Sequence, residues 1–124
     1  MTTSKTLPHI IGGKNVDARS DRRGDVFNPA TGEVQRQVGF ATVDEVDAAV
    51  ASAKKASEEW RNSSLAKRTR ILFSFRELVN KHKDDIAKLL TLEHGKVFSD
   101  AQGEVQRGLE VIEFACGLSH LLKG

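Results

Sequence analysis

The sequence contains a single cysteine, Cys116, and no long run of apolar residues. One cysteine excludes a disulfide within the chain and is typical of a protein from a reducing compartment. The longest apolar runs are a few residues, whereas crossing a bilayer takes roughly 20. The first residues, Met1–Thr6, lack the apolar stretch of a secretory signal. We therefore expect a cytoplasmic protein that does not bind or cross a membrane.

A strong excess of one charge is also missing. The chain has 19 Lys and Arg against 17 Asp and Glu, a net charge of +2. So small an imbalance does not favour a nucleic acid or an anionic membrane as partner. The two basic clusters, residues 19–23 and 67–70, contain no aromatic side chains on which bases could stack. We expect both clusters to be solvated surface, and we expect no nucleic-acid partner.

What is present is an ordinary globular composition, 39% hydrophobic and 29% charged. The hydrophobic pattern changes near Ala41. Residues 1–8 are expected to be disordered or loose, residues 9–40 to form a β-hairpin region, and residues 41–124 to form a three-helix region. The predicted fold class is α+β, two N-terminal β-hairpins followed by three amphipathic helices.

Turn residues predict the two hairpins. Gly12 and Gly13 separate two short strand-like segments and can supply the positive φ angles of a tight turn. In the second hairpin Pro29 presets the turn, and Gly32 can take the left-handed conformation that closes the loop. In the strand that follows, side chains at alternate positions point to opposite faces, which predicts one buried face and one face exposed to water. The positions assigned to the buried face are Val34, Arg36, Val38 and Phe40.

Capping patterns and apolar stripes predict the three helices. Thr42 and Glu45 form a capping box that opens the first helix. The second starts at Ser63 or Ser64 and runs as one helix to Gly95, a left-handed cap. The apolar stripes expected to be buried include Val43, Val46, Val50 and Trp60 in the first helix, and Ile71, Phe75, Leu78, His82, Ile86 and Leu89 in the second.

A second possible capping box, Ser99 with Gln102, opens the third helix. Its predicted buried side is Val105, Leu109, Ile112, Cys116 and Ser119. Two glycines inside this helix, Gly103 and Gly108, each cost roughly 1 kcal/mol relative to alanine. We expect close approach of a neighbouring backbone to compensate for that cost.

No constellation in the sequence predicts a catalytic, cofactor-binding or metal site. Cys116 lies late in a helix, on its apolar side, whereas a reactive cysteine sits at a helix N-terminus or beside a cation. It is therefore interpreted as a buried structural thiol. The histidines show no metal-ligand spacing, and no Gly-x-Gly-x-x-Gly follows a strand. The histidines are His9, His82, His94 and His120.

Two segments resemble the aldehyde dehydrogenase superfamily. Residues 24–34, Gly-Asp-Val-Phe-Asn-Pro-Ala-Thr-Gly-Glu-Val, resemble the superfamily as a whole. The second segment runs from residues 89–96 through residues 107–116, which are similar to one branch, the CoA-acylating methylmalonate-semialdehyde dehydrogenases. Within them Glu93, Gly95 and Lys96 match a Glu-x-Gly-Lys pattern. In physical terms this pattern ends a helix, and the lysine complements the helix dipole.

The resemblance implies an N-terminal segment of such an enzyme, truncated within its NAD-binding domain. Its parent would use NAD and coenzyme A on malonate or methylmalonate semialdehyde, with the catalytic cysteine beyond Gly124. The chain itself would bind neither cofactor, would be inactive, and would contact the remainder of the enzyme or self-associate. Some members hold a cation where Val26 stands, with Glu104 the nearest carboxylate to match, and no site is assigned on that basis. A hydrolytic aldehyde dehydrogenase or a free-standing helical interaction module remains as an alternative.

Overall fold

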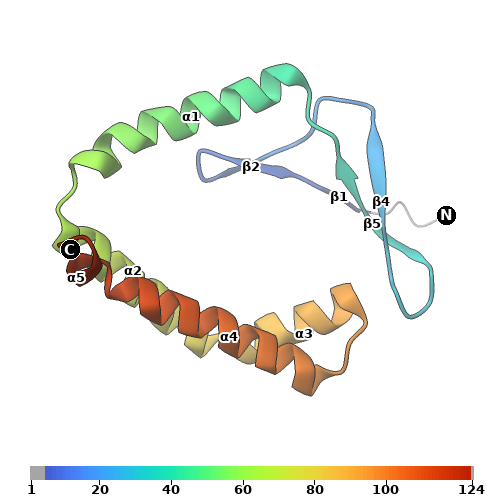
Figure 1. Ribbon diagram of the computed structural model, residues 1–124. Coiled ribbons are helices and arrows are strands. Elements are labelled where there is room, and N and C mark those ends of the chain that lie inside the picture. Colours follow the sequence, from blue (N-terminus) through green and yellow to red (C-terminus); the bar gives the residue numbers. More distant parts are fainter. Residues whose placement is uncertain (1–4, 124) are drawn as a thin grey trace. The chain divides into compact units, whose positions relative to one another are not determined.

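The computed structural model describes residues 5–123, and within them it contains five strands and five helices (Figure 1). Every strand precedes Phe40 and every helix follows Thr42, which confirms the predicted α+β class. Five helices replace the three that the sequence predicted. The chain divides into two compact units, residues 1–62 and 63–124. The first helix therefore belongs with the strands.

The first unit contains a three-stranded sheet in the order β1-β5-β4, made of β1 (Lys5–Leu7), β4 (Arg23–Phe27) and β5 (Val34–Gly39). β4 pairs with β5 in antiparallel register and β1 pairs with β5 in parallel register. The expectation that residues 1–8 are loose is wrong for residues 5–7, because the free edge of β5 offers their backbone groups hydrogen-bonding partners. Residues 1–4 lie outside the described part of the chain.

The loop between β4 and β5 forms as its turn residues predicted. Gly32 has a φ of 75°, in the left-handed region. Its N–H donates to the carbonyl of Asn28 at 2.7 Å, and the Asn28 N–H donates to the carbonyl of Glu33 at 2.8 Å. The Asn28 side chain accepts a further bond from the Ala30 N–H at 2.9 Å. These bonds fix the length of the hairpin and hence the register of its strands.

The other predicted hairpin is also confirmed. β2 (His9–Ile11) pairs antiparallel with β3 (Lys14–Val16). Gly12 and Gly13 connect them with φ angles of 59° and 75°. Both angles are those of the tight turn that suits twisted strands. β2 lies against helix α1 (Val43–Asn62), so the hairpin and this helix belong to one packed unit.

The Glu45 carboxylate holds the start of α1 in place. Its Oε2 accepts from the Thr42 N–H at 2.8 Å and from the Thr42 hydroxyl at 2.9 Å, and the Glu45 N–H donates back to that hydroxyl. This is the predicted capping box. The other oxygen, Oε1, accepts from the Arg19 N–H at 2.8 Å, a contact that the sequence did not predict. These hydrogen bonds, those from the Thr42 and Arg19 backbone first, lower the pKa of Glu45 to about 2.

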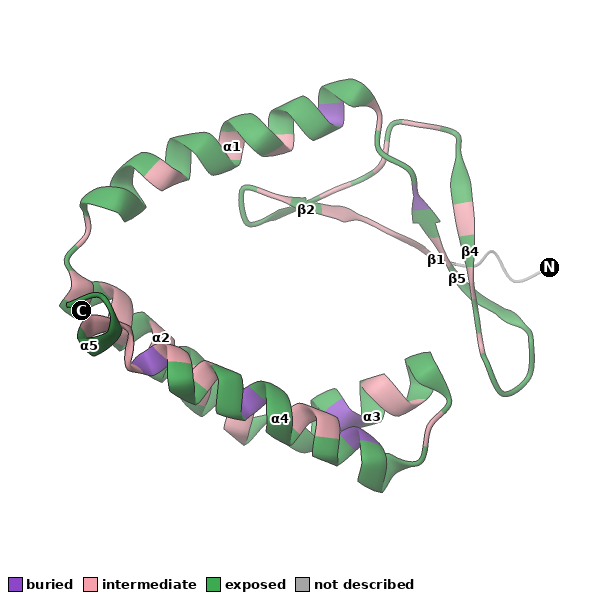
Figure 2. Cartoon of the chain, in the orientation of Figure 1, coloured by how far each residue is buried: buried purple, intermediate pink, exposed green. Residues whose placement is uncertain are grey.

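The second unit is a helical assembly centred on α4 (Phe98–Cys116), which packs against α2 (Leu65–Lys81) and α3 (Lys83–His94). A short helix α5 (Leu118–Leu121) follows. Four side chains are buried here, among them Ala87 of α3 and Ala101 of α4, neither of which has any exposed surface. Figure 2 shows buried positions along α4 and on the facing α3. The other two are Leu109 and Cys116.

The prediction of one continuous helix from Ser63 or Ser64 to Gly95 is wrong. Ser64 caps α2 through its side chain and Gly95 ends α3 in the left-handed conformation, so both ends are correct. Between them His82 has φ −105° and ψ 14°, which turns the chain out of helical geometry. The new helix begins at Lys83, and Asp84 and Asp85 lie in its first turn, where carboxylates interact favourably with the helix dipole. The break lets α2 and α3 both pack on α4.

Two expectations about α4 are also wrong. The helix begins at Phe98 with Val97 at the N-cap, so Ser99 lies inside the first turn and cannot form the capping box. Gly103 and Gly108 have no close neighbour, because a Cβ built on either would meet nothing within 4 Å. Their expected compensation by a neighbouring backbone is therefore absent from the described residues. The predicted buried side of α4 is otherwise correct, since Leu109 and Cys116 are buried.

The other apolar stripes are exposed, contrary to expectation. Val38 on β5 and Phe40 just after it are exposed. Gly39 between them is buried against Ala18, whose Cβ would lie 2.2 Å from a Cβ on that glycine. On α1 the face that is buried carries Glu45 rather than the valines. The exposed members of the predicted stripes are Val34, Val43, Val46, Val50, Trp60, Ile71, Phe75, Leu78, Ile86 and Leu89.

Glu45→Gln is expected to change how the free energy of unfolding depends on pH. The carboxylate has a folded pKa of about 2 against an ordinary value of 4.5. Its stabilisation is therefore complete above pH 4.5 and is lost as the pH falls towards 2. Urea unfolding between pH 2 and pH 6 should show a smaller acid loss in the variant. Glu58→Gln, at an exposed carboxylate of the same helix, is the control, and equal acid losses in all three proteins would contradict the role of Glu45.

Two substitutions on α4 should change stability in opposite directions. Ala101→Leu forces a larger side chain into a site with no free surface and should lower the free energy of unfolding by about 1–3 kcal/mol. Gly103→Ala adds a methyl group in open space and should raise it by about 0.5–1 kcal/mol through the helix propensity of alanine. Urea denaturation measures both. A stable Ala101→Leu protein would show that α3 does not lie close to α4.

Candidate functional site

Cys116, the only thiol, ends α4 and is 6% exposed. It borders a cavity of about 530 Å³ in the second unit, together with Thr69, Arg76 and His120. A cysteine nucleophile needs a helix N-terminus or an available cation to favour its thiolate. Cys116 lies instead at a helix C-terminus, where carbonyl groups rather than N–H groups are unpaired. The geometry therefore matches a structural thiol.

Arg76, a cation that lines the same cavity, is already engaged. Its Nη2 lies 2.5 Å and its Nε 2.9 Å from Oε1 of Glu113, and its Nη1 donates to Glu77 at 2.9 Å. Hydrogen bonds to Glu113 first and then to Glu77 raise the pKa of Arg76. The guanidinium thus ties α2 to α4. Sequence analysis missed this pair, because no local spacing links residues 37 positions apart.

Lys96 is the centre of a second ion-pair cluster that the sequence analysis did not predict. Its Nζ lies 2.5 Å from the Asp100 carboxylate and also bonds Glu104. Hydrogen bonds to Asp100 and then Glu104 raise the pKa of Lys96, and the bond from Lys96 lowers the pKa of Asp100. The sequence analysis expected Lys96 to complement the dipole at the end of α3. In the structure its side chain instead pairs with carboxylates of α4. The four-residue spacing from Lys96 to Asp100 was the available signal.

This cluster also bears on the carboxylate considered for a cation site. Glu104 was the nearest candidate to act with Val26, but its carboxylate bonds the ammonium of Lys96. Val26 belongs to the other compact unit. No group of three His, Cys, Asp or Glu side chains suited to a metal occurs within residues 5–123.

Two of the histidines have described surroundings. The Nδ1 of His82 lies 3.7 Å from the Asp85 carboxylate, and the Nε2 of His9 is buried without a hydrogen bond in the described structure.

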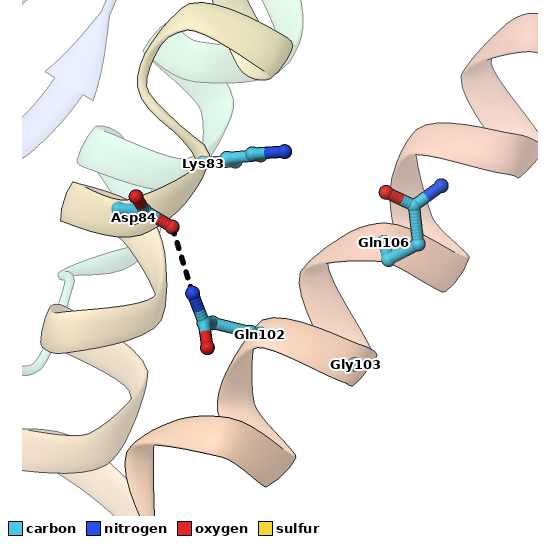
Figure 3. A pocket seen from close by; sticks show the side chains of 5 residues that line it. All are labelled: Lys83, Asp84, Gln102, Gly103 and Gln106. Atoms are coloured by element: carbon cyan, nitrogen blue, oxygen red, sulfur yellow. Dashed lines mark hydrogen bonds between the residues drawn. The ribbon is translucent and has the colours of Figure 1, made fainter.

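A small polar pocket lies between the start of α3 and the middle of α4 (Figure 3). It has a volume of about 250 Å³ and is lined by Lys83, Asp84, Gln102, Gly103 and Gln106. Gln102 Nε2 donates to Asp84 Oδ1 at 3.0 Å across it. All five residues are exposed. This pocket offers hydrogen bonds to water but no nucleophile with an adjacent base, which acyl or hydride chemistry would require.

The strand-to-helix connection from β5 to α1 is the place where a phosphate group could bind a helix N-terminus. The Glu45 carboxylate already occupies the free N–H of Thr42 there. Its negative charge would repel a pyrophosphate, and no glycine lies between Phe40 and Thr42. The residues at this connection therefore do not fit a dinucleotide.

Among residues 5–123, no helix is long and apolar enough to cross a membrane.

Relatives of this chain are dehydrogenases acting on aldehydes. Malonate-semialdehyde dehydrogenase 3 of Geobacillus kaustophilus is 50% identical over all 124 residues, and a malonate-semialdehyde dehydrogenase of Oceanobacillus iheyensis is 45% identical over 123. These matches cover 26% and 25% of the two relatives. The chain thus spans about a quarter of the length of the curated relatives that it matches.

Solved structures give the same picture. Methylmalonate-semialdehyde dehydrogenase from Oceanimonas doudoroffii superposes with a TM-score of 0.91 at 45% identity, covering 97% of this chain and 24% of that one. A Sinorhizobium meliloti protein assigned the same activity, crystallised with NAD, also has a TM-score of 0.91, at 42% identity over 98% of this chain and 25% of that one. Residues 16–124 match the aldehyde dehydrogenase family, and the chain belongs to that family.

Proposed function

We propose that this chain is the N-terminal scaffold of an NAD-dependent, CoA-acylating malonate- or methylmalonate-semialdehyde dehydrogenase. The observation that carries the proposal is identity of 45–50% along nearly all 124 residues to malonate-semialdehyde dehydrogenases. Other aldehyde dehydrogenases are less similar in structure and sequence, for example an NAD-dependent benzaldehyde dehydrogenase at 31% identity and a TM-score of 0.84. The CoA-dependent branch is therefore preferred to a hydrolytic enzyme.

In the proposed enzyme the aldehyde is oxidised with NAD as hydride acceptor, and coenzyme A receives the acyl group after loss of carbon dioxide. We propose that residues 1–124 supply no catalytic, cofactor-binding or metal-binding residue to that reaction. Cys116 is a buried structural thiol at a helix C-terminus, and Glu45 blocks the strand-to-helix connection to a phosphate. The contribution of this chain to the enzyme is structural, and it consists of the sheet, α1 and the α2–α4 assembly.

The exposed apolar stripes support this scaffold role. A soluble protein rarely leaves large contiguous apolar patches open to water, and such patches mark contact surfaces. We propose that the remainder of the dehydrogenase covers these stripes in the whole enzyme. We propose that the 124-residue chain on its own hides them by self-association. We further propose a cytoplasmic enzyme with no nucleic-acid partner, consistent with one cysteine and a net charge of +2.

A chimera tests the proposed activity. Residues 1–124 should replace the aligned first quarter of the Geobacillus kaustophilus relative with retention of activity, because the two segments are 50% identical. The chimera should reduce NAD in the presence of malonate semialdehyde and coenzyme A, with acetyl-CoA as product. This chain alone and the relative without its first quarter are the controls, and both should be inactive. A chimera that forms the free acid regardless of coenzyme A would favour the hydrolytic alternative.

Cys116 should behave as a structural thiol. Because it is buried at the end of α4, a thiol reagent should label it slowly in the native protein and quickly in urea. Cys116→Ala should lower stability without changing the activity of the chimera. Mass spectrometry of timed samples gives the labelling rate, and calorimetric titration with NAD tests cofactor binding. Fast native labelling, or micromolar NAD affinity of the chain alone, would contradict the scaffold proposal.

A further inference from the structure

We draw no further inference here: the strongest candidate, the cavity of about 530 Å³ between α2, α4 and α5, rests on the lone thiol of Cys116, because Arg76 on its wall is already paired with Glu113 and Glu77 and no other described residue that lines it points to a ligand.

Discussion

The second unit depends on the contact that small side chains allow between α3 and α4. Ala87 and Ala101 have no exposed surface, so the two helices lie close at these positions. Around this apolar contact the ion pairs of Lys96 and Arg76 connect α4 to the segment before it and to α2. Apolar packing sets how near the helices lie, and the charged groups at the rim fix their register. The break at His82 follows from this arrangement, because a straight helix could not pack on α4 over its whole length.

Local patterns predicted local structure well. Thr42 with Glu45, Gly12 with Gly13, and the caps at Ser64 and Gly95 all depend on interactions within a few residues, and all were predicted correctly. His82 could not be predicted as a break. The apolar stripe continues in phase through it, so periodicity gives no sign of the turn. The bond from Arg19 to Glu45 and the pair of Arg76 with Glu113 join distant residues, which spacing rules do not detect.

Burial was the property that the sequence predicted least well. The apolar stripes were identified correctly as stripes, but most of their members are exposed. An apolar stripe in the sequence indicates that one side of a helix is suited to burial, but it does not identify the surface that buries it. The prediction that the chain holds no catalytic site is a separate matter. A segment similar to a quarter of each relative can form its helices and strands without containing a complete site.

The bond between the Arg19 N–H and Glu45 has a consequence for the order of folding. Residues 19 and 45 enclose the whole β4–β5 hairpin, so the bond closes a loop of 26 residues. Closing so long a loop from an unfolded chain is slow and entropically costly, whereas a hairpin formed first shortens the effective loop. The first turn of α1 should therefore be completed only after β4 and β5 have paired. A single carboxylate thus couples the start of a helix to the formation of a sheet.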